Sequence, residues 1–235
     1  MSAQKDLKFF TTQPHNCSYL PEKQAVTLFM DPDAQLNESL YNHLSEVGFR
    51  RSGQHIYRPH CNGCNACIPS RVVVRLFSPK RSHRRNWNKN RDLVVTRHKA
   101  LYTEESYDLY RRYISEQHID GDMYPPSIEQ FQSFLVQCPD LCSFYHFRLK
   151  DKLIAVAVTD RLSSGLSAIY TFYDPEYSKR SLGRYCILWQ IEEARRLGLD
   201  YLHLGYWIKG CRKMSYKMEY RPLEIYVNNQ WRLQS

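Results

Sequence analysis

The sequence predicts an α+β fold with a smaller cysteine-containing region before residue 100 and a larger domain after it. Three observations lead to this prediction. Apolar side chains recur at helical spacing between residues 103 and 135, whereas three later segments alternate as strands. Three closely spaced cysteines and all of the excess positive charge lie within the first hundred residues. We therefore expect an N-terminal cysteine-containing basic region over residues 1–100 and a second domain over residues 101–235.

The composition is that of a globular protein without a membrane segment. The 235 residues carry a net charge of +9. The longest apolar run, Leu153–Val158, is far shorter than the roughly 20 residues of a membrane span. The N-terminus lacks a basic stretch followed by an apolar one, so we expect no secretory signal. We therefore expect a cytoplasmic protein, whose eight cysteines should not be read as four disulfides.

The first hundred residues read as one helix, three short strands and a basic helix. Leucines at helical spacing predict a helix over residues 34–47 that ends at Gly48. Three strands are expected at residues 49–53, 55–59 and 71–77. The basic block after Pro79 is predicted to form the second helix.

The second region begins with two capped helices. Thr103, followed by two glutamates, and Ser127, followed by Gln130, have the spacing of helix N-terminal caps. Three strands are then expected at residues 143–149, 153–159 and 166–173. The remaining elements are a helix over residues 183–197, a strand over residues 201–207 and a hairpin that turns at Asn228 and Asn229.

The positive charge is concentrated in one segment. Residues 71–99 contain ten Lys and Arg residues and one acid, Asp92, so the rest of the chain is neutral overall. Six of these cations lie in the block KRSHRRNWNKNR, residues 80–91, together with the indole of Trp87. Clustered cations displace condensed counterions from phosphates, so this block predicts a nucleic-acid partner. The alternative is a solvated basic helix face without a partner.

A second mixed segment, YWIKGCRKMSYKMEYRP, covers residues 206–222. Its four Tyr and Trp residues are interleaved with five cations, against the single acid Glu219. This pattern suits a groove that stacks unpaired nucleotides and holds phosphates. The cations would equally suit a substrate carboxylate, which Arg binds bidentately. In the alternative interpretation the tyrosines face the core and the cations face water.

The stretch HCNGCNAC, residues 60–67, contains three cysteines at C-x2-C-x2-C spacing: Cys61, Cys64 and Cys67. Thiolates at this spacing supply three ligands, and a closed zinc or iron–sulfur site needs four. The candidates for the fourth ligand are, in order of preference, Cys17 and then His60 or His15. The alternative is that these thiols pack as small apolar groups. The other four cysteines are expected to be core or bystander residues: Cys138, Cys142, Cys186 and Cys211.

The loop RSLGRY, residues 180–185, connects a predicted strand to a predicted helix. A glycine-containing loop at a helix N-terminus offers free N–H groups to an anion. The GNAT acetyltransferase fold has an Arg/Gln-x-x-Gly-x-Gly/Ala loop at this position for the CoA pyrophosphate. Arg180 and Gly183 resemble that loop, and Tyr185 departs from it because a bulky side chain there would crowd the pyrophosphate.

Six motifs, in order, resemble one family across nearly the whole chain. They are HNCSYLP (15–21), GFRRSGQHIYRPHCNGCNACIPSRV (48–72), FSPKRSHRR (77–85), YTFYDP (170–175), SLG (181–183) and LGYWIKGCRKMSYKMEYRP (204–222). These segments closely resemble the bacterial aminoacyl-tRNA–protein transferases, the aspartate/glutamate leucyltransferases related to eukaryotic arginyltransferase. The resemblance implies a GNAT-like C-terminal half that takes aminoacyl-tRNA in place of acetyl-CoA. It also implies transfer of leucine from leucyl-tRNA to proteins with N-terminal Asp or Glu, a step of the N-degron pathway of protein degradation.

The implied chemistry needs neither a covalent intermediate nor a cofactor. The donor ester is already activated, and a free α-amine, with a pKa of about 7.7–8.0, is partly neutral near pH 7. Catalysis then depends on positioning the amine and the ester and on donors for the tetrahedral oxyanion. The expected donors are the backbone near Ser181 and Gly183 and the hydroxyls of Tyr170 and Tyr206.

Selection of an acidic acceptor residue requires a cationic pocket, because a buried unpaired carboxylate is costly. The candidates for this pocket are Arg71, Arg81, Lys213, Lys217 and Arg221. The residues expected to contact tRNA are Lys80, Arg84, Arg85, Lys89, Arg91, Arg180, Tyr216 and Tyr220.

The resemblance has departures, and alternatives stay open. Eukaryotic relatives carry a Cys-x-x-Cys pair where this chain has residues 17–20, and adjacent cysteines where it has Ala66 and Cys67. A family-type metal or iron–sulfur cluster would therefore need Cys61 and Cys64 as substitute ligands. The alternatives to leucyl transfer are arginyl transfer to the same acceptors, acetyl transfer from CoA, and a non-catalytic tRNA-binding or redox-sensing protein. Tyr185 and the basic region argue against the CoA alternative.

Overall fold

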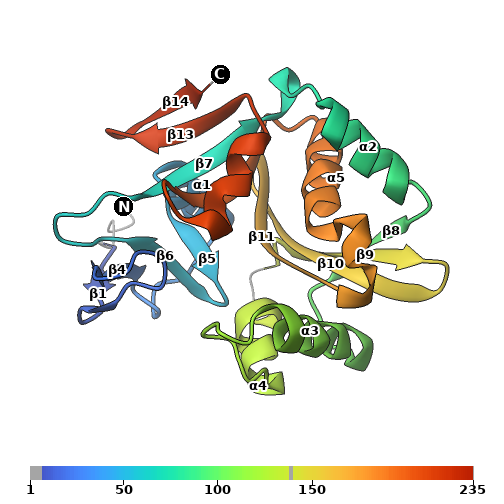
Figure 1. Ribbon diagram of the computed structural model, residues 1–235. Coiled ribbons are helices and arrows are strands. Elements are labelled where there is room, and N and C mark those ends of the chain that lie inside the picture. Colours follow the sequence, from blue (N-terminus) through green and yellow to red (C-terminus); the bar gives the residue numbers. More distant parts are fainter. Residues whose placement is uncertain (1–6, 138–139, 235) are drawn as a thin grey trace.

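An eight-stranded sheet forms the centre of the molecule (Figure 1). The computed structural model describes residues 7–137 and 140–234. The strands, in spatial order, are β14 (Gln230–Gln234), β13 (Leu223–Val227), β7 (Cys67–Val73), β12 (Tyr201–Ile208), β11 (Gly165–Tyr173), β10 (Lys152–Arg161), β9 (Cys142–Leu149) and β8 (Val94–Lys99). Each neighbouring pair is antiparallel except β11 and β12, which are parallel.

Helices cover both faces of this sheet. They are α1 (Glu38–Glu46), α2 (Arg81–Asn90), α3 (Glu104–Gln117), α4 (Ile128–Phe131) and α5 (Leu182–Arg196), with short turns η1 (Val74–Leu76), η2 (Gln132–Val136), η3 (Pro175–Arg180) and η4 (Arg212–Glu219). Figure 1 shows α5 with α2 beside it on one face, and α3 with α4 on the other. Side chains of β10 alternate between these layers, Ala157 beneath α5 and Val156 and Val158 beneath α3, so the strand is buried on both faces.

The N-terminal region forms its own small sheet against the large one. Its strands, in spatial order, are β1 (Phe9–Thr11), β4 (Thr27–Met30), β6 (His55–Pro59) and β5 (Arg50–Ser52), and β2 (His15–Asn16) pairs with β3 (Gln24–Ala25). Helix α1 packs on it through Tyr41 and Leu44. The same apolar cluster includes Leu162 from the end of β10, so this region shares a core with the large sheet.

Most predicted elements are present, and the caps have the expected geometry. The side chain of Thr103 accepts from the backbone N–H of Ser106, and that of Ser127 accepts from Gln130. Asn228 and Asn229 have φ values of 51° and 58°, as the hairpin between β13 and β14 requires.

The strand predicted at residues 71–77 is wrong in position. The strand is β7, which runs from Cys67 to Val73, and a 3₁₀ turn follows it. The reason lies in its neighbour: β12 begins at Tyr201 opposite Val73, so no strand is available to pair beyond that point. Val74 instead donates its N–H to the carbonyl of Asp200.

The large sheet crosses the expected boundary at residue 100. Strands β7 and β8 come from the first hundred residues, yet β7 lies between β12 and β13. The two predicted regions therefore share one sheet. No helix within residues 7–137 and 140–234 is long and apolar enough to cross a membrane.

Candidate active site

The parallel strands β11 and β12 separate part-way along their length. They pair from Gly165–Tyr201 to Ser167–His203, and β11 continues to Tyr173 while β12 continues to Ile208. We call the space between the two unpaired ends the fork. A bulge lies at this point of β12, where Gly205 has a φ of +76°. Beyond this point β11 and β12 are not paired with each other, and each keeps its other neighbour in the sheet.

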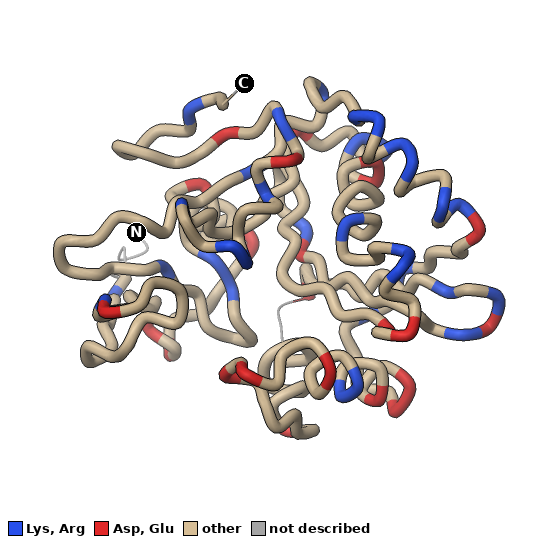
Figure 2. The backbone as a smooth tube through the Cα atoms, in the orientation of Figure 1, with Lys and Arg blue, Asp and Glu red and all other residues tan. Residues whose placement is uncertain are grey.

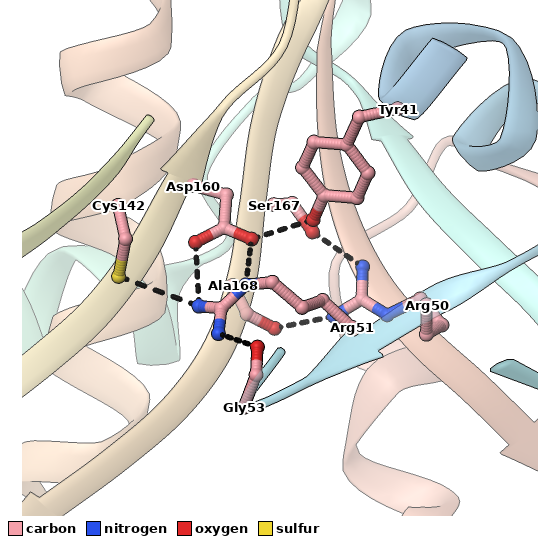
Figure 3. Close-up of polar contacts among 8 residues, drawn as sticks. All are labelled: Tyr41, Arg50, Arg51, Gly53, Cys142, Asp160, Ser167 and Ala168. Carbon is pink, nitrogen blue, oxygen red and sulfur yellow. Dashed lines mark hydrogen bonds and ion pairs between the residues drawn. The ribbon is translucent and has the colours of Figure 1, made fainter. Parts of the chain in front are cut away.

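The side chain of Arg50 reaches the point where the fork begins. Its Nη1 donates to Ser167 Oγ at 2.6 Å and its Nη2 to the carbonyl of Ala168 at 2.7 Å (Figure 3). A Cβ atom on Gly205 would lie 3.3 Å from Arg50 Nε. The glycine therefore gives the guanidinium room against β12. The site thus holds a half-buried cation between the two strands.

Lys217 and Tyr206 form the β12 side of the fork. Lys217 is 5% exposed and its Nζ donates to the carbonyl of Tyr206 at 2.5 Å. Burial, followed by the charge of Arg50, lowers the pKa of Lys217 to about 7. The hydroxyl of Tyr206 lies near the carbonyls of Gly48, at 2.9 Å, and Tyr57, at 3.3 Å, and donates its proton there. This hydroxyl is committed to the backbone, which places its proton away from a substrate oxyanion.

Tyrosines also line the β11 side of the fork. The hydroxyl of Tyr170 is buried and has no hydrogen-bond partner among the described residues, and burial raises its pKa. Tyr113 of α3 lies with its ring 4.8 Å from that of Tyr173 and 6.4 Å from that of Tyr170. Tyr216 of η4 is 40% exposed, yet burial around its hydroxyl raises its pKa.

The N-terminus of α5 lies beside the end of β11. Ser181 caps the helix in the left-handed conformation, and a Cβ atom on Gly183 would lie 3.4 Å from Cε1 of Tyr173. Two asparagines on the inner face of α2 fix this loop: Nδ2 of both Asn86 and Asn90 lies 3.0 Å from the carbonyl of Arg180. The free N–H groups of the helix are thereby positioned next to the fork.

Tyr185 does not crowd this loop. Its side chain is buried against the rings of Trp87 and Phe147, with centroid distances of 5.4 and 5.8 Å. The expectation that Tyr185 excludes CoA was therefore wrong, because the residue at this helix position faces the core rather than the loop.

The cations of the basic helix α2 are exposed, and Figure 2 shows Lys and Arg positions recurring along this helix. The exposed residues of this stretch are Lys80, Arg81, Arg84, Arg85, Lys89 and Arg91. Arg180 differs, because its guanidinium is paired bidentately with Asp92 at 2.8 and 2.9 Å. Tyr220 is 1% exposed and its ring stacks on His83 at 5.4 Å, so it has no free face for a base. Of the predicted tRNA contacts, those on α2 and at its two ends, and Tyr216 of η4, are exposed.

The five candidates for the acceptor pocket are not brought together. Arg71 is buried between Glu46 and Glu224, at 2.8 and 2.7 Å, and its guanidinium lies over the rings of Tyr201 and Trp231. Its charge is already neutralised. Arg81, Lys213 and Arg221 are exposed on α2, on η4 and after η4. Lys217 alone among these five candidates lies within the fork.

The four candidate metal ligands gather in one place. Burial is the main cause that raises the pKa of Cys67 to about 11, and the nearby Cys61, Cys17 and Cys64 add to it. Cys61 Sγ accepts from the N–H of Val26 at 3.4 Å. Among residues 7–137 and 140–234, no three His, Cys, Asp or Glu side chains are arranged to hold a metal ion. As placed, these thiols do not fit a closed ligand set, so we derive no step through a metal, and the zinc or iron–sulfur site stays a prediction.

The remaining cysteines divide into two kinds. Cys142 and Cys186 are buried, as expected for core residues. Cys211 is half-buried beside η4. Cys138 lies outside the described residues.

Comparison with known proteins identifies the family. The model described as "Arginine-tRNA-protein transferase, N terminus" matches residues 15–85, and that described as "Arginine-tRNA-protein transferase, C terminus" matches residues 105–227. The chain belongs to this family. It is thus an aminoacyltransferase that uses tRNA and protein substrates.

Curated members of this transferase family are close in sequence. A protein of Pseudomonas paraeruginosa named "Aspartate/glutamate leucyltransferase" is 60% identical over 225 residues, which cover 96% of each chain. One of the same name from Pseudomonas fluorescens is 58% identical over the same length. Among solved structures, "The structure of L-PGS from Bacillus licheniformis" matches 72% of this chain and 59% of that one, with a TM-score of 0.51 at 10% identity. This last likeness concerns the fold alone and agrees with the α+β, GNAT-like class.

Arg50 is the fork residue that the sequence did not single out. It lies in FRRSG, two adjacent arginines in a short strand. Because successive side chains of a strand point to opposite faces, a pair of this kind in a half-buried strand places at least one arginine inward. The pair of arginines could thus have been noticed in the sequence. The partner of Arg50, Ser167 of β11, lies 117 residues later and could not be predicted.

Proposed function

We propose that this transferase moves leucine from leucyl-tRNA to the α-amine of proteins that begin with Asp or Glu, in the cytoplasm. The observation that supports this most is the 60% identity, over 96% of the chain, to a relative named "Aspartate/glutamate leucyltransferase". The fork is the place we propose for the reaction, with Arg50 at its start and Lys217 beside Tyr206.

The step balances without a cofactor. The neutral α-amine attacks the ester carbonyl, a C–N bond forms, and the C–O bond to the terminal ribose breaks. The proton lost by the amine goes to the ribose oxygen, which leaves as the free hydroxyl of tRNA. The enzyme contributes positioning and donors for the oxyanion, for which the N–H groups near Ser181 and Gly183 and the unpartnered hydroxyl of Tyr170 are the candidates.

The tRNA is expected on the face that carries α2 and α5. The exposed cations of α2 contact phosphates, and the loop that Asn86 and Asn90 hold directs the aminoacylated end toward the fork. A second candidate donor is arginyl-tRNA, because the matching family model is described as an arginine-tRNA-protein transferase.

The test is transfer of radiolabelled leucine from leucyl-tRNA to peptides that begin with Asp, Glu, Lys or Ala. We expect label on the Asp and Glu peptides only. Labelled arginyl-tRNA, run in parallel, is expected to give no labelled peptide. A labelled peptide from it would show that the enzyme uses arginyl-tRNA as donor. A folded protein that binds tRNA and labels none of the peptides from either donor would refute the proposal.

A further inference from the structure

Arg50 carries a positive charge that no acid among the described residues neutralises. Its two hydrogen bonds go to the neutral Ser167 Oγ and to the carbonyl of Ala168, and within residues 7–137 and 140–234 it forms no ion pair. The guanidinium has five N–H donors, so most of its capacity is unused by these two bonds. A half-buried cation of this kind is favourable only if an anion joins it or water reaches it.

The adjacent Arg51 shows what full neutralisation looks like in the same strand. Its Nε and Nη2 bind the two oxygens of Asp160 at 2.6 and 2.8 Å, and its Nη1 donates to the carbonyl of Gly53 (Figure 3). Arg51 is therefore a structural residue. Arg50, one position earlier, has the same chemistry without the carboxylate.

The field of Arg50 extends across the fork. Its charge counteracts the burial that raises the pKa of Tyr57, Tyr206 and Tyr216, and it helps to lower the pKa of Lys217. The positive charge of Arg50 thus favours an anion near these four side chains.

Arg50 lies on the opposite face of the sheet from the basic helix. Leu166 and Leu202 pack in the same apolar cluster as α5, so the next residue of each strand, Ser167 and His203, points to the other face. Arg50 binds Ser167 on that face, which the N-terminal region covers. The tRNA is expected on the face of α5 and α2, so the ligand of Arg50 is not a tRNA phosphate.

The two substrates would then meet in the fork from opposite faces. An acceptor that enters on the face of Arg50 brings its α-amine toward the separated strands. The side chain of its first residue then points toward Arg50, where the two strands begin to separate. The bonds to Ser167 and Ala168 use one N–H of each Nη, and the remaining N–H donors are of the kind that binds a carboxylate.

We propose that Arg50 binds the side-chain carboxylate of the acceptor's first residue and thereby determines the preference for Asp and Glu. This inference rests on the function proposed above and names the residue that its specificity requires. None of the five cations expected from the sequence is needed for this contact.

The test compares Arg50→Gln with wild type on matched peptides that begin with Asp, Asn, Glu, Gln or Ala. We expect kcat/KM for the Asp and Glu peptides to fall about 100-fold or more, because the carboxylate loses its partner. The values for the Asn, Gln and Ala peptides should change little, so the preference for acids is lost. Arg111→Gln, an exposed α3 residue paired with Asp108, is the matched control.

An equal fall on all five peptides would overturn the inference, because it would place Arg50 on the ester rather than on the acceptor side chain. An unchanged preference would also overturn it. Arg50→Met, which also removes the charge, is the second variant if Arg50→Gln does not fold; an intact preference for Asp over Asn in this variant would count against the proposal. Thermal unfolding and leucyl-tRNA binding report folding in each case.

Failure of the proposed function gives a different result. Wild-type protein that labels no peptide refutes leucyl transfer itself. Fluorescence anisotropy of labelled Asp and Asn peptides, without tRNA, then still tests the inference. Wild type should bind the Asp peptide more tightly and Arg50→Gln should bind both equally; equal binding by wild type would contradict the role of Arg50.

Discussion

Lys217 is an ammonium-bearing side chain held in a site that disfavours its charge. Its pKa of about 7 lies below the 10.5 of an unperturbed lysine because the side chain is buried and faces Arg50. The unfolded chain keeps the proton up to about pH 10.5, whereas the folded protein releases it above about pH 7. Unfolding between these values takes up a proton, so a rise in pH stabilises the folded state.

We predict that the free energy of unfolding of wild type rises relative to Lys217→Met as the pH goes from 7 to 9, with a slope of up to about 1.4 kcal/mol per pH unit. Below pH 7 both states hold the proton and this slope disappears. Urea unfolding at several pH values measures it. The exposed Lys213→Met is the control and should follow wild type; an identical slope in Lys217→Met would show that the lysine keeps a normal pKa.

Gly205 is predicted to be intolerant of any side chain. A Cβ atom would meet Arg50 Nε at 3.3 Å, and the φ of +76° is strained for an L-residue. We expect Gly205→Ala to lower stability by about 1–2 kcal/mol and to weaken the preference for acidic acceptors, because Arg50 must shift. Gly63→Ala, also at positive φ but with open space around it, is the matched control. If both variants lose stability and the preference for acidic acceptors is unchanged, Gly205 does not affect specificity through Arg50.

The site was less predictable than the elements that carry it. Lys217 was named from the cations in its own segment, but Arg71 was named for the same reason and proves to be neutralised by Glu46 and Glu224. The acids that pair with Arg71 lie 25 and 153 residues away in the sequence. The residues next to a cation therefore do not reveal whether it has such a partner in the fold. Arg50 was missed for the same reason, because its proposed role depends on where the fold places it relative to β11 and β12.

At the scale of elements, α2 combines two faces with different tasks. His83, Asn86 and Asn90 face inward, where the asparagines hold the loop before α5, and the cations face solvent. The basic block after Pro79 predicted this helix correctly. The helix has few apolar residues, and polar residues form its buried face. The inward role of the asparagines had no signal in the sequence.

We predict that Arg84→Gln, Arg85→Gln and Arg91→Gln together weaken tRNA binding and reduce its salt dependence. Removing one cation from a phosphate should lower the slope of log K against log salt by roughly 0.7–0.9. Filter binding across a series of salt concentrations measures both effects.

The control for this experiment removes three exposed cations from other elements: Lys8, Arg111 and Arg232. This variant has the same net charge and should retain the slope. An equal reduction in both triple variants would assign the effect to net charge rather than to α2.

Elements with local signals were found, and those without were misplaced. The caps at Thr103 and Ser127 and the turn at Asn228 and Asn229 depend on neighbours in sequence. The ends of β7 depend on where β12 begins, more than 120 residues later, so the strand was predicted at residues 71–77 instead of Cys67–Val73. The two-residue strands β2 and β3 are too short to carry a pattern.

At the scale of the molecule, one buried ion pair joins the N-terminal region to the large sheet. Arg51 of β5 binds Asp160 of β10, both side chains are at most 1% exposed, and the hydroxyl of Tyr41 donates to the same carboxylate at 2.5 Å. We predict that Asp160→Asn destabilises the protein by about 3–5 kcal/mol, because it leaves the guanidinium buried and unpaired. Denaturant unfolding measures the loss.

The surface pair Arg196–Glu193 provides the comparison, and Arg196→Gln is expected to have a much smaller effect, because an exposed ion pair contributes little to stability. A similar small cost for Asp160→Asn would mean that water or another group satisfies Arg51. The double variant Arg51→Met with Asp160→Leu should cost less than the sum of the single changes, since it removes both charges.

The position of β7 between β12 and β13 has a consequence for synthesis. On the ribosome, residues 67–73 emerge long before either neighbouring strand, the nearer of which begins at Tyr201. The centre of the sheet therefore cannot close until most of the polypeptide has been translated, and β7 stays an unpaired, apolar segment for that interval. Translation speed and early binding by a chaperone should govern the yield of this protein more than that of a chain whose strands pair in order.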